Sequence, residues 1–330
     1  MNTIFPINFS HTMMSDLWSC EFKWYRSHCQ RLSGVHRSGD LIAGGLFAKA
    51  CEITRKAYFN DGVDEETAID LGFTHILIGE DTTDDLKTNE RMAFVFKKYM
   101  QKFRMDSSLV PMKLADGTSA IEYTFMLDTG IQHPELLDQN IIFKGKLDGL
   151  YERIHMGKSV GKFVVDEKTT KSVRRVKGTK AKLIDINAEE DSHRVDGQFI
   201  GYHWAARQLG VKTDKALIRR IPIGVEYEAA FELEIPVNPH MIHHWETATF
   251  SKIAEMAEKY KWLKKSGKDP QAAFYPVYNK GCTDFAKLCP FYEGCSEPHG
   301  DAILASRYQQ LVFHDGKNIE LNEYRKLVGL

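Results

Sequence analysis

Two acidic residues and a lysine lie in two consecutive apolar segments of the chain. Asp148 falls within segment 145–150, and Asp166 and Lys168 fall within segment 163–170. If the two segments pair as a hairpin, the carboxylates lie side by side and repel one another unless a cation lies between them. Carboxylate oxygens bind hard divalent cations, and a lysine ammonium can orient water or offset charge on a phosphate. The pattern therefore predicts metal-dependent cleavage of phosphodiester bonds.

A D-x-K spacing on its own is common by chance and then describes a solvated strand end. Besides Asp148, two neighbouring features favour a site. Glu122 is a charged residue on the otherwise apolar strand 118–128, although an outward-facing position explains it equally well. Gln198 and Tyr202 place an amide and a phenol one helical turn apart on one face of a predicted helix. We therefore expect these three residues to join the two acids, with Glu122 as a further metal ligand.

The order of these residues resembles the PD-(D/E)xK nuclease superfamily. The likeness is greatest to its RecB-like branch, which includes the AddB and RecB nuclease domains and the CRISPR-associated RecB-like exonucleases. The matching positions are Gly145, Asp148, Asp166, Lys168, Thr169, Gln198 and Tyr202. The resemblance implies that Asp148 and Asp166 bind Mg²⁺ or Mn²⁺ and that Lys168 is the catalytic lysine. It also implies that Gln198 and Tyr202 orient the site and touch the DNA strand.

One position departs from the pattern of that family. Many RecB-like enzymes carry a histidine ligand on an N-terminal helix, in a Gly-x-x-x-His pattern, and here Ala48 takes the place of the histidine after Gly44. A site made of carboxylates alone still suits magnesium. The loss of one ligand favours weakened activity, an altered number of metal ions or a repurposed site. Glu52, one helical turn after Ala48, is a candidate substitute.

Four cysteines form a second candidate site. Cys282, Cys289 and Cys295 lie close together in a loop-like tail, which suggests ligation of a soft metal, the alternative being a chance clustering of buried thiols. Cys20 lies in a segment that resembles the N-terminal segment of the iron–sulfur members of the RecB-like branch. In those members one early and three late cysteines hold a [4Fe–4S] cluster, so the resemblance implies such a cluster here. Zinc would accept the same four thiolates and is the alternative.

Composition limits the class of protein. The chain has 330 residues, of which 43% are hydrophobic and 27% are charged, with a formal net charge of −1. A sizeable globular core is expected, and any contact with DNA must come from a local basic patch. Segment 168–182 holds seven basic residues and no acid, which makes it either a phosphate clamp or a solvated loop. With no long apolar segment and no secretory signal, the expected location is the cytoplasm, away from membranes.

The helices and strands that are expected to position these residues indicate an α/β fold with a restriction-endonuclease-like core. Its mixed central sheet is flanked by helices, and the cysteine-ligated cluster staples the N- and C-terminal segments together. Predicted helices cover 13–32, 41–60, 82–103, 196–209 and 239–265, and predicted strands cover 118–128, 141–154, 161–170, 215–224 and 226–236.

The same pattern leads us to expect a single domain over 1–330. Its N-terminal helical part would cover 1–110, its catalytic core 111–240, and its C-terminal helix and cysteine-rich segment 241–330. Segment 172–196 shows no clear period and is predicted to be a loop over the site. Glu167 is expected to point to the opposite face of its strand from Asp166 and to be structural.

The sequence thus predicts a stand-alone metal-dependent DNA nuclease. The resemblance favours an exonuclease that acts on single-stranded DNA ends in repair, recombination or phage DNA processing. A helicase or recombination protein is a candidate partner. The alternative is a catalytically weak or inactive module that binds a DNA end or a partner, with a structural iron–sulfur or zinc site. The alanine at position 48 favours that alternative.

Overall fold

The computed structural model divides the chain into two compact units. Unit 1 comprises Met1–His36, Asp128–Phe143 and Thr249–Leu330, and unit 2 comprises Arg37–Leu127 and Lys144–Ala248. The structure describes residues 3–33, 39–81, 87–114, 117–170, 174–177, 180–183, 186–224, 229–236, 238–278, 281–283, 288–296, 304 and 309–310. Of residues 33, 39–40, 174–177, 180–183, 186–188 and 309–310 it describes the backbone only.

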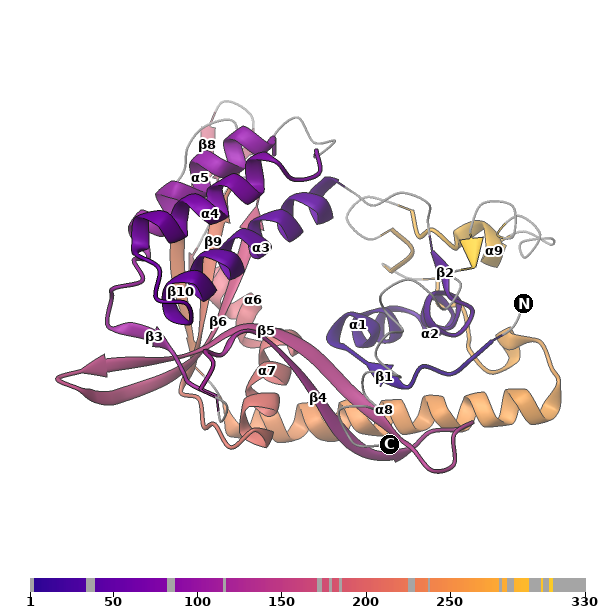
Figure 1. The fold of residues 1–330 in the computed structure, drawn as a ribbon. Helices are drawn as coiled ribbons and strands as arrows, with labels where there is room; N and C mark the ends of the chain where they lie inside the picture. Colours follow the sequence, from indigo (N-terminus) through magenta and orange to yellow (C-terminus); the bar gives the residue numbers. More distant parts are fainter. Residues whose placement is uncertain are drawn as a thin grey trace. The chain divides into compact units, whose positions relative to one another are not determined.

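A mixed sheet forms the centre of unit 2. Its strands are β3 (Leu109–Pro111), β4 (Ile121–Gln132), β5 (Asn140–His155), β6 (Lys158–Thr170), β9 (Lys215–Pro222) and β10 (Phe231–Pro236). Strand β5 pairs antiparallel with β6, β6 pairs parallel with β9, and β9 pairs antiparallel with β10, while β3 and β4 both pair with β5. The predicted mixed α/β architecture is therefore confirmed (Figure 1).

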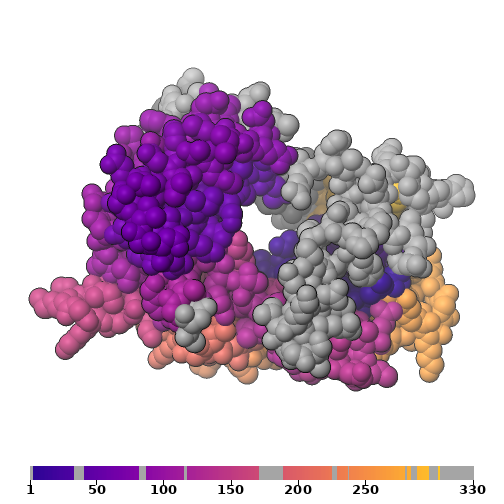
Figure 2. All heavy atoms as spheres, viewed as in Figure 1, coloured from indigo at the N-terminus to yellow at the C-terminus, as the bar shows by residue number. Residues whose placement is uncertain are grey.

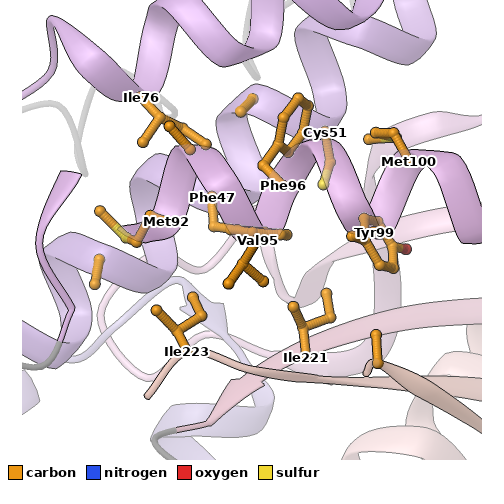
Figure 3. Packing of buried hydrophobic residues seen from close by; sticks show 14 residues of the cluster. Phe47, Cys51, Ile76, Met92, Val95, Phe96, Tyr99, Met100, Ile221 and Ile223 are labelled. Carbon is orange, nitrogen blue, oxygen red and sulfur yellow. The ribbon is translucent and has the colours of Figure 1, made fainter. Parts of the chain in front are cut away.

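Three helices cover one face of this sheet. They are α3 (Gly39–Phe59), α4 (Glu65–Leu77) and α5 (Asn89–Lys102). Their inner faces meet the end of β9 in one cluster, in which Phe47, Phe96 and Ile221 are at most 1% exposed (Figure 3). Burying a side chain of this size contributes roughly 1.5–3 kcal/mol. This packing fixes α3 and α5 against the sheet.

The hairpin of β5 and β6 is tighter and longer than the predicted one. Its turn consists of Met156 and Gly157 alone, with φ values of 50° and 74°. Positive φ at both central residues gives a turn whose twist matches that of the paired strands. The tip stands clear of the neighbouring elements of unit 2 (Figures 1 and 2), and the Met156 side chain is 88% exposed.

Segment 172–196 is not the loop that the sequence predicted. It contains β7 (Arg174–Lys177), β8 (Lys180–Leu183) and α6 (Ile186–Arg194), followed by α7 (Gly197–Gln208). Strands β7 and β8 pair only with each other in the described part of the chain. The sequence of this segment lacks the alternation of apolar and polar residues by which strands are recognised, so the hairpin was not predicted.

Two further elements differ from the prediction. Helix α4 was not predicted, although Asp64 caps it by accepting a hydrogen bond from the Thr67 N–H. Segment 13–32 is divided into α1 (His11–Ser19), α2 (Glu21–Trp24) and a π-helical turn (Tyr25–Cys29), with Cys20 extended between the first two. The break leaves Cys20 outside a regular helix.

Unit 1 has an aromatic core of its own. Phe5 packs edge-on against Trp24 and Tyr260, with ring centroids 5.7 and 5.3 Å apart. Strand β1 (Asn8–Phe9) pairs parallel with the first residues of β5, and the unit also contains most of α8 (Pro239–Ser266) and the short helix α9 (Tyr292–Ser296). None of the helices in the described part of the chain is both long enough and apolar enough to cross a membrane.

Candidate active site

Asp148 and Asp166 lie side by side at the point where β5 and β6 part. The ladder between the two strands ends on this side with the pair Gly149 and Val165. Asp148 and Asp166 are the next residues on either strand. The backbone N–H of Glu167 donates to Asp148 Oδ2 at 2.8 Å. The predicted hairpin therefore brings the two carboxylates together within unit 2.

The surroundings of these two acids oppose their ionisation. Burial raises the pKa of Asp148 well above its ordinary value, and the carboxylates of Asp166 and Glu122 raise it further. Burial also raises the pKa of Asp166, although the Lys168 ammonium opposes that shift. Asp166 Oδ2 is buried and accepts no hydrogen bond in the structure. Both acids therefore suit a cation, whose charge would remove the repulsion and fill the open lone pairs.

Lys168 links the strand to helix α7. Its Nζ lies 3.1 Å from each carboxylate oxygen of Asp166 and donates to Gln198 Oε1 at 3.2 Å. Gln198 Nε2 in turn donates to the Tyr202 hydroxyl at 2.7 Å. The side chain of Asp196 caps α7 by accepting from the Gln198 N–H. The predicted amide and phenol therefore stand one helical turn apart beside the lysine.

Tyr202 is kept neutral by its surroundings. Its side chain is buried, and burial together with the carboxylates of Asp166, Asp148 and Glu122 raises the pKa of its hydroxyl. Because the hydroxyl accepts its hydrogen bond from Gln198, its own proton is free to be donated to another oxygen. The chain of hydrogen bonds from Asp166 to Tyr202 is thus a connected network.

Glu122 occupies a strained position on β4. Its φ of 52° lies in the left-handed region, which costs a non-glycine residue about 1–3 kcal/mol. Its carboxylate is 5% exposed and pairs with Lys146 Nζ at 2.5 Å. Burial raises the pKa of Glu122, and Lys146 opposes that shift. Glu122 is therefore turned inward, and the outward-facing alternative is excluded.

Helix α3 brings a carboxylate to this region where the family pattern has a histidine. Ala48 has no group that can bind a metal, but the Glu52 side chain is only 12% exposed. It pairs with Lys49 at 3.0 Å, Lys56 at 2.8 Å and Lys146 at 3.8 Å. Lys146 thus joins Glu52 to Glu122. The sequence argument missed Lys146, although its place two residues before Asp148 puts both on one face of β5.

Glu167 points away from the site, in the direction expected for a structural residue. Its carboxylate is buried in an ion pair with Arg55 of α3 and accepts from the Tyr99 hydroxyl of α5. Arg55 and Tyr99 lower the pKa of Glu167, against the effect of burial. Alternate residues of β6 therefore face opposite helices: Asp166 and Lys168 face α7, and Glu167 faces α3 and α5.

The basic segment 168–182 is only partly described. Lys171 lies outside the described residues, and the side chains of Arg174, Arg175, Lys177, Lys180 and Lys182 are not described. Apart from Lys168, the side chains of the expected phosphate clamp lie outside the described part of the chain, so the clamp stays a prediction. In the described part of the chain, no three or more His, Cys, Asp or Glu side chains are already arranged to hold a metal ion.

The four cysteines predicted as cluster ligands line one cavity in unit 1. It is lined by Cys20, Lys23, Pro276, Val277, Tyr278, Gly281, Cys282, Cys289, Phe291, Tyr292 and Cys295. All four cysteines are free thiols. The cavity brings together one cysteine from the start of the chain and three from its last sixty residues.

The thiols of this cavity influence one another. Burial raises the pKa of Cys295 to about 11, and the nearby Cys20, Cys289 and Cys282 raise it in addition. Burial, Cys282 and Cys20 likewise raise the pKa of Cys289, whereas Lys23 lowers it. Thiols gathered in this way suit a positively charged centre, which would stabilise their thiolates.

Comparison with known proteins gives little guidance. No protein-family model and no curated protein matches the chain. Among solved structures, one from Eubacterium rectale, provisionally named an exonuclease, has 15% sequence identity and a TM-score of 0.38, over 79% of this chain and 82% of that chain. The structure of SSO0001 has 14% identity and a TM-score of 0.25, over 64% of this chain and 86% of that chain. At TM-scores this low, neither likeness bears on function, which has to be inferred from the residues of the site.

Proposed function

We propose that unit 2 is a PD-(D/E)xK nuclease core that hydrolyses phosphodiester bonds of DNA with the help of Mg²⁺ or Mn²⁺. The observation that carries the proposal is the pair Asp148 and Asp166, buried side by side, with Asp166 Oδ2 accepting no hydrogen bond. Lys168 and Gln198 border the pair on one side. Two buried acids of raised pKa beside a positioned lysine are typical of a catalytic site and costly in a purely structural one.

Each residue of the site is proposed to have a separate role in hydrolysis. A bound divalent cation supplies Lewis-acid polarisation of the phosphate and a more acidic water molecule. Asp148 and Asp166 would hold that cation. Lys168, held by Asp166 and Gln198, offers its ammonium to the attacking water or to the developing charge on phosphate. Tyr202 can donate its hydroxyl proton to a phosphate oxygen.

The substrate is proposed to be DNA with a free single-stranded end, cleaved in exonuclease mode. The order of the motif residues, which resembles that of RecB-like exonucleases, supports this choice. Repair, recombination and phage DNA processing are the settings in which such ends arise, and a helicase or recombination protein would be the natural partner. We place such an enzyme in the cytoplasm.

The cysteine cavity of unit 1 is proposed to hold a [4Fe–4S] cluster. Four free thiols line one cavity, and the neighbouring cysteines raise the pKa of both Cys289 and Cys295, which supports a cationic centre there. Four thiolates suit such a cluster. Zinc is the alternative occupant. In either case the centre would tie the first helices of unit 1 to the last segment of the chain.

A cleavage assay tests the proposed activity. We expect the purified protein to degrade end-labelled single-stranded DNA in Mg²⁺ or Mn²⁺ and to be inactive in EDTA. Lys168→Ala should reduce the rate about 10²–10³-fold, because it removes a charge aimed at the reacting phosphate. Lys162→Ala, six residues earlier on β6, is the matched control and should cleave at the wild-type rate. Equal rates for wild type and Lys168→Ala would exclude the enzymatic proposal.

The second candidate is a module that binds a DNA end or a partner without cleaving it. Ala48, in the position of the family's histidine, favours this candidate. It predicts that the protein retains labelled DNA in a gel-shift experiment, with no cleavage in any divalent metal. The same samples used in the cleavage assay therefore distinguish the two candidates.

A further inference from the structure

A lysine that the proposed chemistry does not use stands among the acids of unit 2. Lys146 Nζ lies 2.5 Å from Glu122 Oε2 and 3.8 Å from Glu52 Oε2. These two carboxylates come from different elements, β4 and α3, and are 5% and 12% exposed. Half of the Lys146 side chain is exposed, so the ammonium reaches from the surface between two largely buried acids.

The acidic residues near the hairpin differ in whether they form an ion pair with a basic side chain. Asp166 pairs with Lys168, and Glu167 pairs with Arg55. Glu122 and Glu52 share Lys146. Among the described residues Asp148 forms no ion pair. Its carboxylate accepts a hydrogen bond from the backbone N–H of Glu167. The need for a further positive charge is therefore greatest at Asp148, whose neighbour Asp166 already pairs with Lys168.

The backbone holds this distribution in place. Glu122 keeps its side chain directed inward at the cost of a φ of 52°, and its carboxylate is already satisfied by the lysine. A second metal ion bound by Glu122 and Glu52 would have to displace the Lys146 ammonium. It would otherwise lie within a few ångströms of that charge, where repulsion in a partly buried site amounts to several kcal/mol.

We propose that Lys146 is a resident cation that takes the place of a second metal ion, so that unit 2 binds one divalent cation, at Asp148 and Asp166. The inference rests on the proposed function, which supplies the need for a metal. It assigns Glu122 and Glu52 to the lysine instead of the metal. It also explains why position 48 is not a histidine. A site that binds a single metal ion does not need the additional ligand that a histidine at this position would supply.

The stoichiometry of Mn²⁺ binding tests the inference. Free Mn²⁺ is measured by electron paramagnetic resonance during titration of the metal-free protein, in which any cluster in unit 1 is left intact. The wild type is expected to bind one Mn²⁺ per chain. Lys146→Met, which keeps the aliphatic stem and removes the charge, is expected to bind a second, because Glu122 and Glu52 are then without a shared cation.

Lys49→Met is the matched control. Lys49 also pairs with Glu52, at 3.0 Å, but makes no ion pair with Glu122 in the described structure. This variant removes one positive charge from beside Glu52, as Lys146→Met does, and should still bind one Mn²⁺. Lys146→Arg, which keeps the charge, should likewise bind one. Circular dichroism spectra that match the wild type would show that the variants remain folded.

The outcomes separate the two proposals. Two ions on the wild type, or one ion on Lys146→Met, would overturn the role of Lys146 while leaving a metal-dependent nuclease in place. No Mn²⁺ bound by the wild type in unit 2, together with no cleavage of DNA, would remove the proposed function and with it the inference. Two ions on Lys49→Met would show that loss of any charge near Glu52 suffices, and would also overturn it.

Discussion

At the scale of single residues, the surroundings of Asp148 oppose its negative charge. Its carboxyl is buried, and the carboxylates of Asp166 and Glu122 raise its pKa further. An acid whose pKa is raised in the folded chain stabilises the fold below its unfolded pKa and loses that contribution as pH rises through the folded pKa. The protein without metal should therefore lose stability at neutral and alkaline pH on account of this residue.

The substitution Asp148→Asn tests whether the buried Asp148 carboxylate destabilises the metal-free protein. At pH 8 in EDTA the variant should be more stable than the wild type by about 1–3 kcal/mol, because the repulsion is gone while the amide oxygen can still accept from the Glu167 N–H. Urea denaturation measures the difference. Asp214→Asn is the control: Asp214 also accepts a β6 N–H, from Lys162 at 2.8 Å, but is exposed, and it should change stability little. A variant less stable than the wild type at pH 8 would refute the reading.

The same variant separates a metal site from a buried carboxyl without function. Mn²⁺ should stabilise the wild type by mass action, since an ion that binds only the folded chain shifts the equilibrium toward it. Asp148→Asn should gain much less at the same concentration of Mn²⁺. Equal stabilisation of both proteins would place the metal elsewhere.

His203 gives a pH dependence of opposite sign. The residue is buried on α7 with Nδ1 2.6 Å from Thr213 Oγ1, and burial, with Arg207, lowers its pKa to about 4 from an ordinary 6.5. The unfolded chain therefore binds the proton more readily, and stability should fall as pH drops from about 6.5 to about 4, by up to about 3 kcal/mol. The wild type and His203→Gln, compared by denaturation at pH 7 and pH 4.5, should differ in this slope. Parallel slopes would contradict the assignment.

At the scale of elements, α7 positions two residues of the site, Gln198 and Tyr202. Its Gly201 lies so close to the start of α8 that an added Cβ would come within 2.7 Å of the Trp245 ring. Trp204 Nε1 donates to Glu246 Oε1 at 2.8 Å and ties the same two helices. The glycine thus lets α7 pack closely, and its neighbours Gln198 and Tyr202 depend on that packing for their place beside Lys168.

Gly201→Ala should accordingly destabilise unit 2. We expect a loss of about 1–3 kcal/mol from overpacking against the indole, measured by thermal or urea unfolding. Gly45→Ala on α3 is the control, since no atom lies within 4 Å of an added Cβ there. That change should leave stability unaltered or raise it by up to about 1 kcal/mol, because alanine favours helix. The structure would be contradicted if the two variants were equally stable.

Local patterns explain which elements could be predicted. The alternating hydrophobicity of the β5–β6 region and the four-residue spacing of Gln198 and Tyr202 are local signals, and both elements occur where expected. The sequence of the β7–β8 hairpin does not alternate between apolar and polar residues and gave no such signal. The sequence of helix α4 does carry a local signal, because Asp64 is a capping residue and Glu65 and Glu66 follow it in the first turn. Lys146 and the inward turn of Glu122 depend on contacts between β4, β5 and α3, which no local pattern encodes.

At the scale of the whole molecule, the division into two units could not be derived from sequence. Unit 1 is assembled from three segments far apart in the chain, and strands β4 and β5 each contribute residues to both units. No shift in composition marks these boundaries. The cysteines are different, because their residue type alone drew attention to both ends of unit 1.

The proposed cluster makes a prediction for unit 1. Protein purified without oxygen should contain about four iron and four sulfide per chain, and Cys20→Ser should lose most of both. Cys29→Ala is the control, because Cys29 is buried outside the cavity, and its iron content should match the wild type. Removal of the iron by a chelator should lower the melting temperature, since the centre closes a long loop of the chain. Stoichiometric zinc without iron, or unchanged iron in Cys20→Ser, would contradict the cluster.

The central claim is that Asp148 and Asp166 serve DNA hydrolysis. Its most direct test is the initial rate at which wild type and Asp166→Asn cleave end-labelled single-stranded DNA in saturating Mn²⁺, with folding of both confirmed by circular dichroism. The substitution keeps the size of the side chain and removes the charge that a cation requires, so the rate should fall at least about a hundredfold. A variant that cleaves at the wild-type rate, or a wild type that does not cleave in any divalent metal, would contradict the account.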